Sequence, residues 1–304
     1  MSSNQSLSPQ TVVGMVVVAI LWAICFPFIS VGLPNAPPLL FASLRAFFAG
    51  ACLIGIGLNM GHSFHCSFRR LAMLALIGFS YTALGLGGMF LGAGNVGPGV
   101  ATVLANAQPL FAAILSIFVL REAITARLFL GLFIGFVGVA VLASPGFDFG
   151  TDRFIGAVYV LVGAVGTAIG NVLLKLQAGE GEVYWPMGIQ LVLGAAFLFV
   201  ASMLVGEGFE VDWTWSFSGA VFVLAVPATA LMVVLWYELL ARAPLNKLNP
   251  FTFLTPAFGL MIGALFFGET FSAVEITGIV ITVVGLMVII LVPIRKSAPN
   301  KVYR

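Results

Sequence analysis

The chain has 304 residues, of which 61% are apolar and only 8% charged, and its formal net charge is +2. A composition this apolar excludes a water-soluble globular domain, and so small a net charge gives no basis for nucleic-acid binding. The sequence therefore predicts an all-α integral membrane protein, because a helix satisfies its own backbone hydrogen bonds in hydrocarbon.

The apolar runs are each close to the roughly 20 residues that cross about 30 Å of hydrocarbon. In the first half they predict transmembrane helices at residues 12–32, 38–58, 71–90, 99–120 and 128–143. In the second half they predict helices at residues 154–175, 184–205, 217–240, 248–267 and 274–291. Between the halves, residues 144–153 are rich in Gly, Pro and Asp and predict a short polar connector.

One pattern of prolines, glutamates and glycines occurs twice, 147 positions apart. The first copy is Pro109, Glu122, Gly131 and Gly138, and the second is Pro256, Glu269, Gly278 and Gly285. Such a duplication predicts two five-helix repeats, residues 12–143 and 154–293, and it is a common plan of secondary transporters.

The basic residues predict the orientation. Outside the spans they fall on the side that holds both termini, apart from Arg153, so we expect both termini to be cytoplasmic. Because each repeat has an odd number of crossings, the second repeat is inverted relative to the first. Inverted repeats place a transport site near the midplane, between the halves.

The two prolines of the repeated pattern lie within predicted spans. A proline removes one N–H and displaces the carbonyl four residues earlier, so Pro109 and Pro256 predict kinks in the fourth and ninth helices. Polar residues stand beside both kinks: Asn106, Gln108, Thr252 and Thr255. Two alternatives stay open for these side chains, namely lining a water-filled cavity together or holding helices to one another.

Three charged residues are further candidates. Arg45 lies about 10 Å inside its span, where it attracts a substrate carboxylate, forms an outer-gate contact, snorkels to the surface, or hydrogen-bonds to carbonyls of a neighbouring helix. Glu122 and Glu269 stand at helix ends, where a carboxylate needs compensation such as the N-terminus of the following helix or a basic neighbour. They are interpreted as structural anchors of a loop or as gate elements.

Aromatic residues supply the remaining cavity candidates, because aromatic rings stack on apolar or aromatic solutes. They are Trp22, Tyr81, Trp236 and Tyr237, for which simple helix packing stays an equal alternative, and the polar Asn171 joins them. The glycines at positions 131, 138, 278 and 285 form one face on each of two helices. These faces pack either within the protomer or in a homodimer interface.

The sequence shows no arrangement that predicts an enzyme. His62, His65 and Cys66 stand close together in one loop but lack a nearby fourth ligand, so no metal and no cofactor is expected. The expected partners are a small-molecule substrate and the lipid bilayer, with no nucleic acid. A channel or scaffold subunit without carrier activity stays open as the alternative to a transporter.

Segments 106–122 and 254–269 resemble the paired signatures of the drug/metabolite transporter superfamily, specifically its ten-helix EamA-type exporters, as do Trp22 in the first span and Arg45 in the second. The resemblance implies a carrier of the bacterial inner membrane that exports amino acids or related metabolites by alternating access. It also implies that spans one, three, four, six, eight and nine line the cavity. The chain departs from a common form of the motif at Arg121, where many members carry glycine, as this chain does at Gly268.

Overall fold

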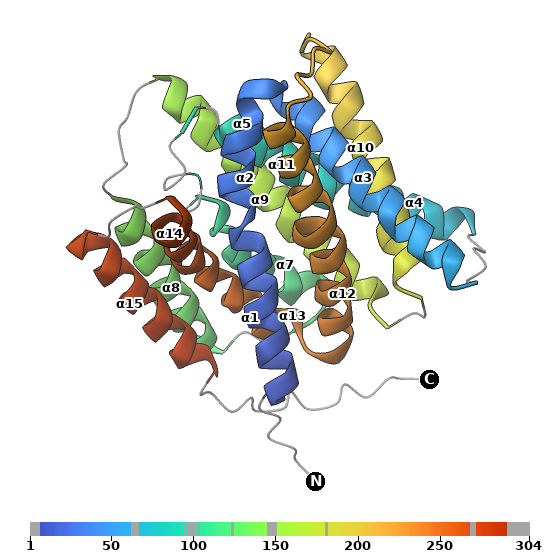
Figure 1. The fold of residues 1–304 in the computed structure, drawn as a ribbon. Coiled ribbons are helices and arrows are strands. Elements are labelled where there is room, and N and C mark those ends of the chain that lie inside the picture. The colour runs from blue at the N-terminus through green and yellow to red at the C-terminus, as the bar shows by residue number, and fades with distance from the viewer. Residues whose placement is uncertain are drawn as a thin grey trace, which may run out of the picture.

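The computed structural model describes residues 7–61, 67–93, 95–96, 101, 104–122, 125–144, 151–179, 182–267 and 272–290, and every regular element in these ranges is helical (Figure 1). The first half contains α1 (Pro9–Ala23), α2 (Cys25–Gly32), α3 (Pro38–Asn59), α4 (Phe68–Ile77), α5 (Gly85–Ala93), α7 (Gln108–Val119) and α8 (Ala126–Ala143). The second half contains α9 (Thr151–Gln177), α10 (Tyr184–Leu204), α11 (Trp215–Ala225), α12 (Met232–Arg242), α13 (Leu245–Leu248), α14 (Leu254–Phe267) and α15 (Ala273–Ile290).

Six stretches of the described chain are helical, long and apolar enough to cross a membrane. They are residues 9–35, 38–59, 68–92, 154–177, 184–204 and 215–242. Shorter apolar helices cover residues 108–119, 126–141 and 273–289. The chain is therefore a multi-pass membrane protein, and the helices coincide with the spans that hydropathy predicts to within a few residues at most ends.

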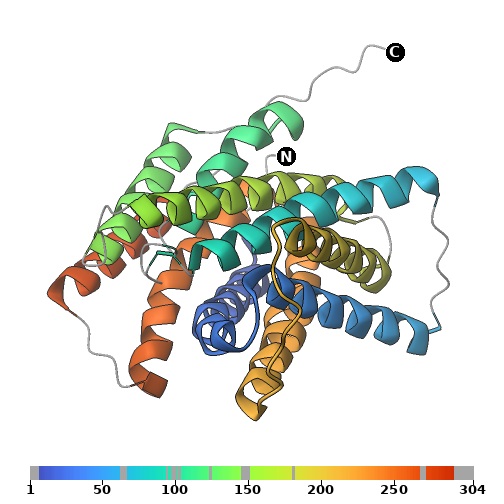
Figure 2. The ribbon, with the colours of Figure 1, turned by 90° about the horizontal axis from the view of Figure 1, so that it is seen from above.

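The helices pack in pairs drawn from the two halves. α3 lies along α10 on one side of the molecule and α8 lies along α15 on the opposite side (Figure 1). Between these pairs, α9 contacts α5 and α7, while α1 contacts α12 and α14. Figure 2, in which α1 is seen nearly end-on, places this helix among helices of the second half. The interior of the protein is therefore formed by contacts between helices of the first half and helices of the second half.

The glycine faces of α8 and α15 meet within the protomer. A Cβ atom added to Gly138 would lie 2.9 Å from the Gly278 oxygen, and one added to Gly131 would lie 2.9 Å from the Gly285 oxygen. Added to Gly285, it would lie 2.8 Å from the Gly131 oxygen. These distances leave no room for a side chain, so the two backbones approach each other directly. Of the two alternatives for these faces, the structure shows intramolecular packing.

Two long helices contain a π-helical segment at matching positions. In the third predicted span, η2 (Gly78–Leu84) separates α4 from α5, and in the eighth, η4 (Val226–Leu231) separates α11 from α12. The second segment lies 147 positions after residues 79–84, which is the spacing of the sequence repeat. A π turn carries an extra residue and disturbs the regular hydrogen-bond ladder, and such turns are frequent at functional sites.

The helices that contain Pro109 and Pro256 are not kinked at these prolines. Instead, the regular helix is interrupted just before each of them. A turn at Asn106 and Ala107 precedes α7, and Pro109 lies in the first turn of that helix. The 3₁₀ segment η5 (Asn249–Phe253) precedes α14, whose first turn contains Pro256. A first-turn proline is tolerated because its missing N–H needs no partner there. The predicted kinks are therefore replaced by breaks, since a proline starts a helix more readily than it continues one.

Arg121 follows α7 and is the described non-glycine residue with positive φ, at 53°. The N–H of Glu122 then donates to the Ser116 oxygen at 3.1 Å and closes the helix end. A side chain in the left-handed region is strained, which explains why glycine suits the corresponding position of the second copy.

We expect Gly285→Val to lower the melting temperature of the purified protein, because the new side chain forces α8 and α15 apart at a cost of about 1–3 kcal/mol. Gly55→Val on α3 is the control, since nothing lies within 4 Å of a Cβ at that position. Thermal unfolding in detergent measures both. Equal shifts for the two variants would contradict close packing at Gly285.

We expect Arg121→Gly to stabilise the protein by up to about 1 kcal/mol, because glycine adopts positive φ without strain. Arg121→Ala removes the same charge but keeps the Cβ atom, so it should give no such gain. The same thermal unfolding assay compares the two. If alanine stabilises as much as glycine, the charge and not the backbone strain is responsible.

Candidate functional site

A cavity lies where the two broken helices face each other. The unfilled space here, counting the part that is open to the surroundings, is about 350 Å³. The structure brings together there five residues that the sequence proposed from three separate spans, with Met89, Ala105 and Thr167 beside them. The five are Trp22, Asn106, Gln108, Thr252 and Thr255. A polar cavity at this position fits the rule that irregular backbone at membrane depth lines a cavity or is buried in protein.

A second cavity adjoins the first, because Trp22, Met89 and Thr167 line both. Two further sequence candidates, Arg45 and Tyr81, line this second cavity. Its other lining residues are Thr82, Gly85, Leu86, Leu191, Thr229, Met232 and Val233. Both π-helical segments contribute to it, with Tyr81 and Thr82 from η2 and Thr229 from η4. We call the two together the central cavity.

Arg45 projects from α3 and is only 2% exposed. Its Nε donates to Thr229 Oγ1 at 2.8 Å, and its Nη2 donates to Cys25 Sγ at 3.1 Å and to the Ala228 oxygen at 3.4 Å. Its guanidinium carbon lies 6.0 Å from the centre of the Phe90 ring. No described carboxylate pairs with it. The side chain therefore does not snorkel, and neutral groups of the first and eighth spans hold its charge.

The π turn of η4 presents these groups to Arg45. Thr229 Oγ1 donates its proton to the Leu224 oxygen five residues earlier at 2.7 Å, which leaves its lone pairs for the Arg45 Nε. On the other side of the cavity Thr82 Oγ1 donates to Gln190 Oε1 at 2.9 Å. Sequence reasoning missed Thr82 and Thr229, because hydrophobic periodicity does not reveal a π turn.

Hydrogen bonds link the two broken helices directly. Gln108 Nε2 donates to Asn249 Oδ1 at 3.2 Å, and Ser116 Oγ donates to Asn246 Oδ1 at 2.9 Å. Thr252 Oγ1 donates to the Asn249 oxygen at 2.8 Å. Gln108 therefore both lines the cavity and holds the two helices together, whereas Thr252 lines the cavity and bonds within its own segment.

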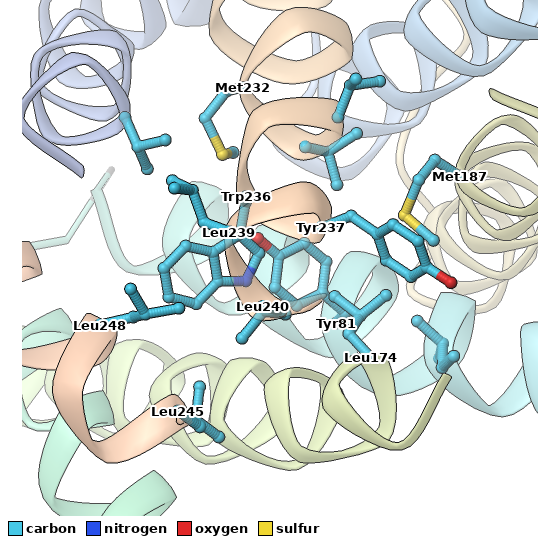
Figure 3. Close-up of a cluster of buried hydrophobic side chains, with 14 of the residues drawn as sticks. Tyr81, Leu174, Met187, Met232, Trp236, Tyr237, Leu239, Leu240, Leu245 and Leu248 are labelled. Carbon is cyan, nitrogen blue, oxygen red and sulfur yellow. The ribbon is translucent and has the colours of Figure 1, made fainter. Parts of the chain in front are cut away.

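Three sequence candidates lie behind the cavity wall. Trp236 is fully buried, and its Nε1 donates to Asn171 Oδ1 at 2.8 Å. Tyr237 donates its hydroxyl hydrogen to the Gln177 oxygen. Figure 3 shows Trp236 and Tyr237 on α12, packed with Leu240 and Tyr81 in one apolar cluster. The structure places Asn171, Trp236 and Tyr237 in helix packing and outside the lining of the central cavity.

Glu122 joins the end of the fourth span to the start of the ninth. Its Oε1 accepts from the Leu245 N–H and its Oε2 from the Asn246 N–H, both at 3.0 Å, so the carboxylate caps the N-terminus of α13. A negative group at a helix N-terminus satisfies free N–H groups and the helix dipole. Lys247 follows Asn246 in α13, and its partial burial lowers its pKa through desolvation. Glu269 lies outside the described residues.

The same end of the molecule holds a second interhelical contact. Lys175, near the end of α9, donates to the Leu240 oxygen and, at 2.8 Å, to the Ala243 oxygen, so it caps the C-terminus of α12. This end lies at the bottom of Figure 1, where α1 also begins. At this end of the molecule, contacts thus join the fourth span to the ninth and the sixth span to the eighth.

Glu207, a carboxylate that sequence reasoning missed, caps a helix at the opposite end. Its Oε1 and Oε2 accept from the N–H groups of Leu39 and Leu40, each at 3.1 Å, at the start of α3. Ser202 Oγ donates to the same carboxylate at 2.7 Å. The described residues contain no cluster of three potential metal ligands, and His62, His65 and Cys66 lie outside them.

The chain resembles known membrane transporters along most of its length. The model of the EamA-like transporter family matches residues 10–144 and 154–291. A probable amino-acid metabolite efflux pump of Salmonella typhimurium is 27% identical over 291 residues, which covers 89% of this chain and 91% of that protein. The uncharacterized inner membrane transporter YedA of Escherichia coli K12 is 28% identical over 264 residues, covering 84% and 82%.

Two further comparisons agree with these. The uncharacterized transporter YvbV of Bacillus subtilis is 25% identical over 270 residues, covering 89% of this chain and 88% of that protein. A solved crystal structure superimposes with a TM-score of 0.77 over 92% of this chain and 98% of that chain, at 18% identity. At this identity the superposition shows a shared fold.

We expect Glu122→Gln to lower the melting temperature by an amount equivalent to about 1 kcal/mol, because a neutral amide caps α13 less well than a carboxylate. Glu238→Gln is the matched control, since Glu238 is 45% exposed and pairs with Arg242 within one helix. Thermal unfolding in detergent compares them. A loss for Glu238→Gln as large as that for Glu122→Gln would contradict the capping role.

Proposed function

Because the chain belongs to the EamA-like transporter family, we propose that it is a secondary carrier that exports small organic solutes, most specifically amino acids or related metabolites, by alternating access across a bacterial inner membrane. The relative from Salmonella typhimurium is a probable amino-acid metabolite efflux pump, and this similarity supports the substrate class. A carrier also agrees with the arrangement of the site, which contains a cavity and no set of catalytic groups among the described residues.

The observation that carries the proposal is the central cavity. Its walls come from both halves of the chain, with Trp22, Arg45, Tyr81 and Asn106 from the first half and Thr252 from the second. A site between two halves can be exposed to either side of the membrane when the halves rock against each other. We take the lining residues of this cavity as the substrate site.

The packing supports the proposed topology of ten spans in two inverted repeats, residues 12–143 and 154–293. α3 packs on α10 and α8 packs on α15, so the second and fifth helices of each repeat contact their own counterparts. Such self-pairing is what a two-fold axis between the repeats produces. The described chain also begins and ends at the same side of Figure 1, in agreement with two cytoplasmic termini.

The contacts of Glu122 and Lys175 supply a physical account of alternating access. In our topology both lie at the cytoplasmic end, where Glu122 joins the two repeats and Lys175 joins two helices of the second repeat. We propose that the Glu122 contact holds the two repeats together at this end. Loading of a substrate from the cytoplasm then requires that contact to break, so Glu122 acts both as an anchor and as part of a gate.

We expect Asn106→Leu and Gln108→Leu to reduce export at least about tenfold, because each removes a polar group from the cavity and leaves its partner unpaired. Asn59→Leu is the control, since Asn59 lies at the exposed end of α3 and contacts no cavity. Cells that overproduce each variant are exposed to toxic amino acids and metabolites, and proteoliposomes then measure export of the compound that the wild type protects against.

Normal export by both cavity variants at wild-type protein levels would contradict the assignment of the site. A conductance far above the turnover of a carrier would contradict the carrier itself and favour a channel.

A further inference from the structure

Part of the Arg45 guanidinium is unused. A guanidinium has five N–H groups, and the contacts to Thr229, Cys25 and Ala228 engage Nε and Nη2. Nη1, with its two N–H groups, makes no hydrogen bond to any residue that the structure describes. Because Arg45 lines the central cavity, this unsatisfied edge is available to a molecule inside it.

A second donor without a partner lies in the same cavity. Tyr81 is 8% exposed, and its hydroxyl forms no hydrogen bond within the described structure. A buried hydroxyl without a partner is unfavourable, and a hydrogen bond to a bound ligand relieves that cost. Two residues that line the part of the cavity between the two π-helical segments, Arg45 and Tyr81, therefore each carry an unsatisfied donor, and one of the donors is cationic.

The positive charge of Arg45 determines which chemical group of a ligand the cavity can bind. Among the described residues that line the cavity, Arg45 is the charged one, and none is a carboxylate. A positive charge in an apolar interior attracts one compensating negative charge, whereas a phosphate with nearly two would be left partly uncompensated. A carboxylate is planar, carries a single charge and accepts several hydrogen bonds, so it fits one Nη group and one hydroxyl.

On the basis of the function proposed above, we propose that Arg45 Nη1 and Tyr81 Oη bind the carboxylate of the exported solute. The rest of the solute then occupies the adjoining part of the cavity. The Trp22 ring, the Gln108 amide and the Thr255 hydroxyl, which has no partner in the described structure, lie there. Aromatic, amide and hydroxyl groups suit an uncharged side chain or an ammonium group. The substrates are therefore solutes with one carboxylate, and the corresponding carboxamides bind more weakly.

The test uses the purified full-length protein in nanodiscs and matched probes. The probes are the twenty common amino acids and the carboxamide of each, and binding is measured as the concentration that produces half of the maximal thermal stabilisation. We expect at least one amino acid to bind with an affinity at least about tenfold above that of its carboxamide, as for a charge-assisted hydrogen bond.

Two substitutions test whether Tyr81 and Arg45 cause the preference for amino acids over carboxamides. Tyr81→Phe deletes a hydroxyl that has no partner, so it should leave folding intact and weaken amino-acid binding at least about threefold without affecting the carboxamide. Arg45→Lys keeps a positive charge but loses the planar guanidinium with its fixed set of donors. It should reduce the preference for an amino acid over its carboxamide. Tyr159→Phe, on the exposed face of α9, is the matched control and should bind as the wild type does.

Each outcome decides the matter. Equal binding of amino acids and carboxamides, no binding of either, or an unchanged preference in Tyr81→Phe would overturn the carboxylate site. Export assays in proteoliposomes separate this from the function: export of carboxamides as well as amino acids overturns the site but keeps the carrier. Selective binding of amino acids without export keeps the site and overturns the carrier.

Discussion

An unpaired backbone polar group is costly in hydrocarbon, and the interior of this protein is organised around that constraint. The irregular backbone of the described chain lies inside the bundle, at the turn before α7, in η5 and in the π-helical segments η2 and η4. Polar side chains of these segments line the central cavity. Because the side chains beside them are polar, the place where helices are broken is also the place where a polar cavity forms.

The buried charge of Arg45 depends on the same irregularity. An arginine at membrane depth costs on the order of 2.5–3.5 kcal/mol on insertion scales, and neutral groups must recover that cost here. The π turn of η4 supplies two of them, Thr229 and the Ala228 oxygen, and Cys25 supplies a third. A regular helix would aim these groups elsewhere. The π turn of η4 therefore holds the Arg45 guanidinium in the cavity and leaves its Nη1 group for a ligand.

Much of the site follows from sequence, for a physical reason that differs between residues. Trp22, Asn106, Gln108, Thr252 and Thr255 stood out because polar or amphipathic side chains are rare in apolar spans, and all five line one cavity. Trp236 and Tyr237 stood out equally but point into a packed cluster, since the face of a helix is chosen by its neighbours. Glu207 and Thr229 gave no local signal, because their partners come from distant segments.

The sequence alone determined the membrane class, the helical spans and the 147-residue spacing, because hydropathy and spacing are local properties that add along the chain. Only the tertiary structure decided which surfaces meet. It placed the glycine faces of α8 and α15 against each other, and it paired Glu122 with the N-terminus of α13, more than 120 positions away. Such partners depend on long-range packing, which no pattern within a single span contains.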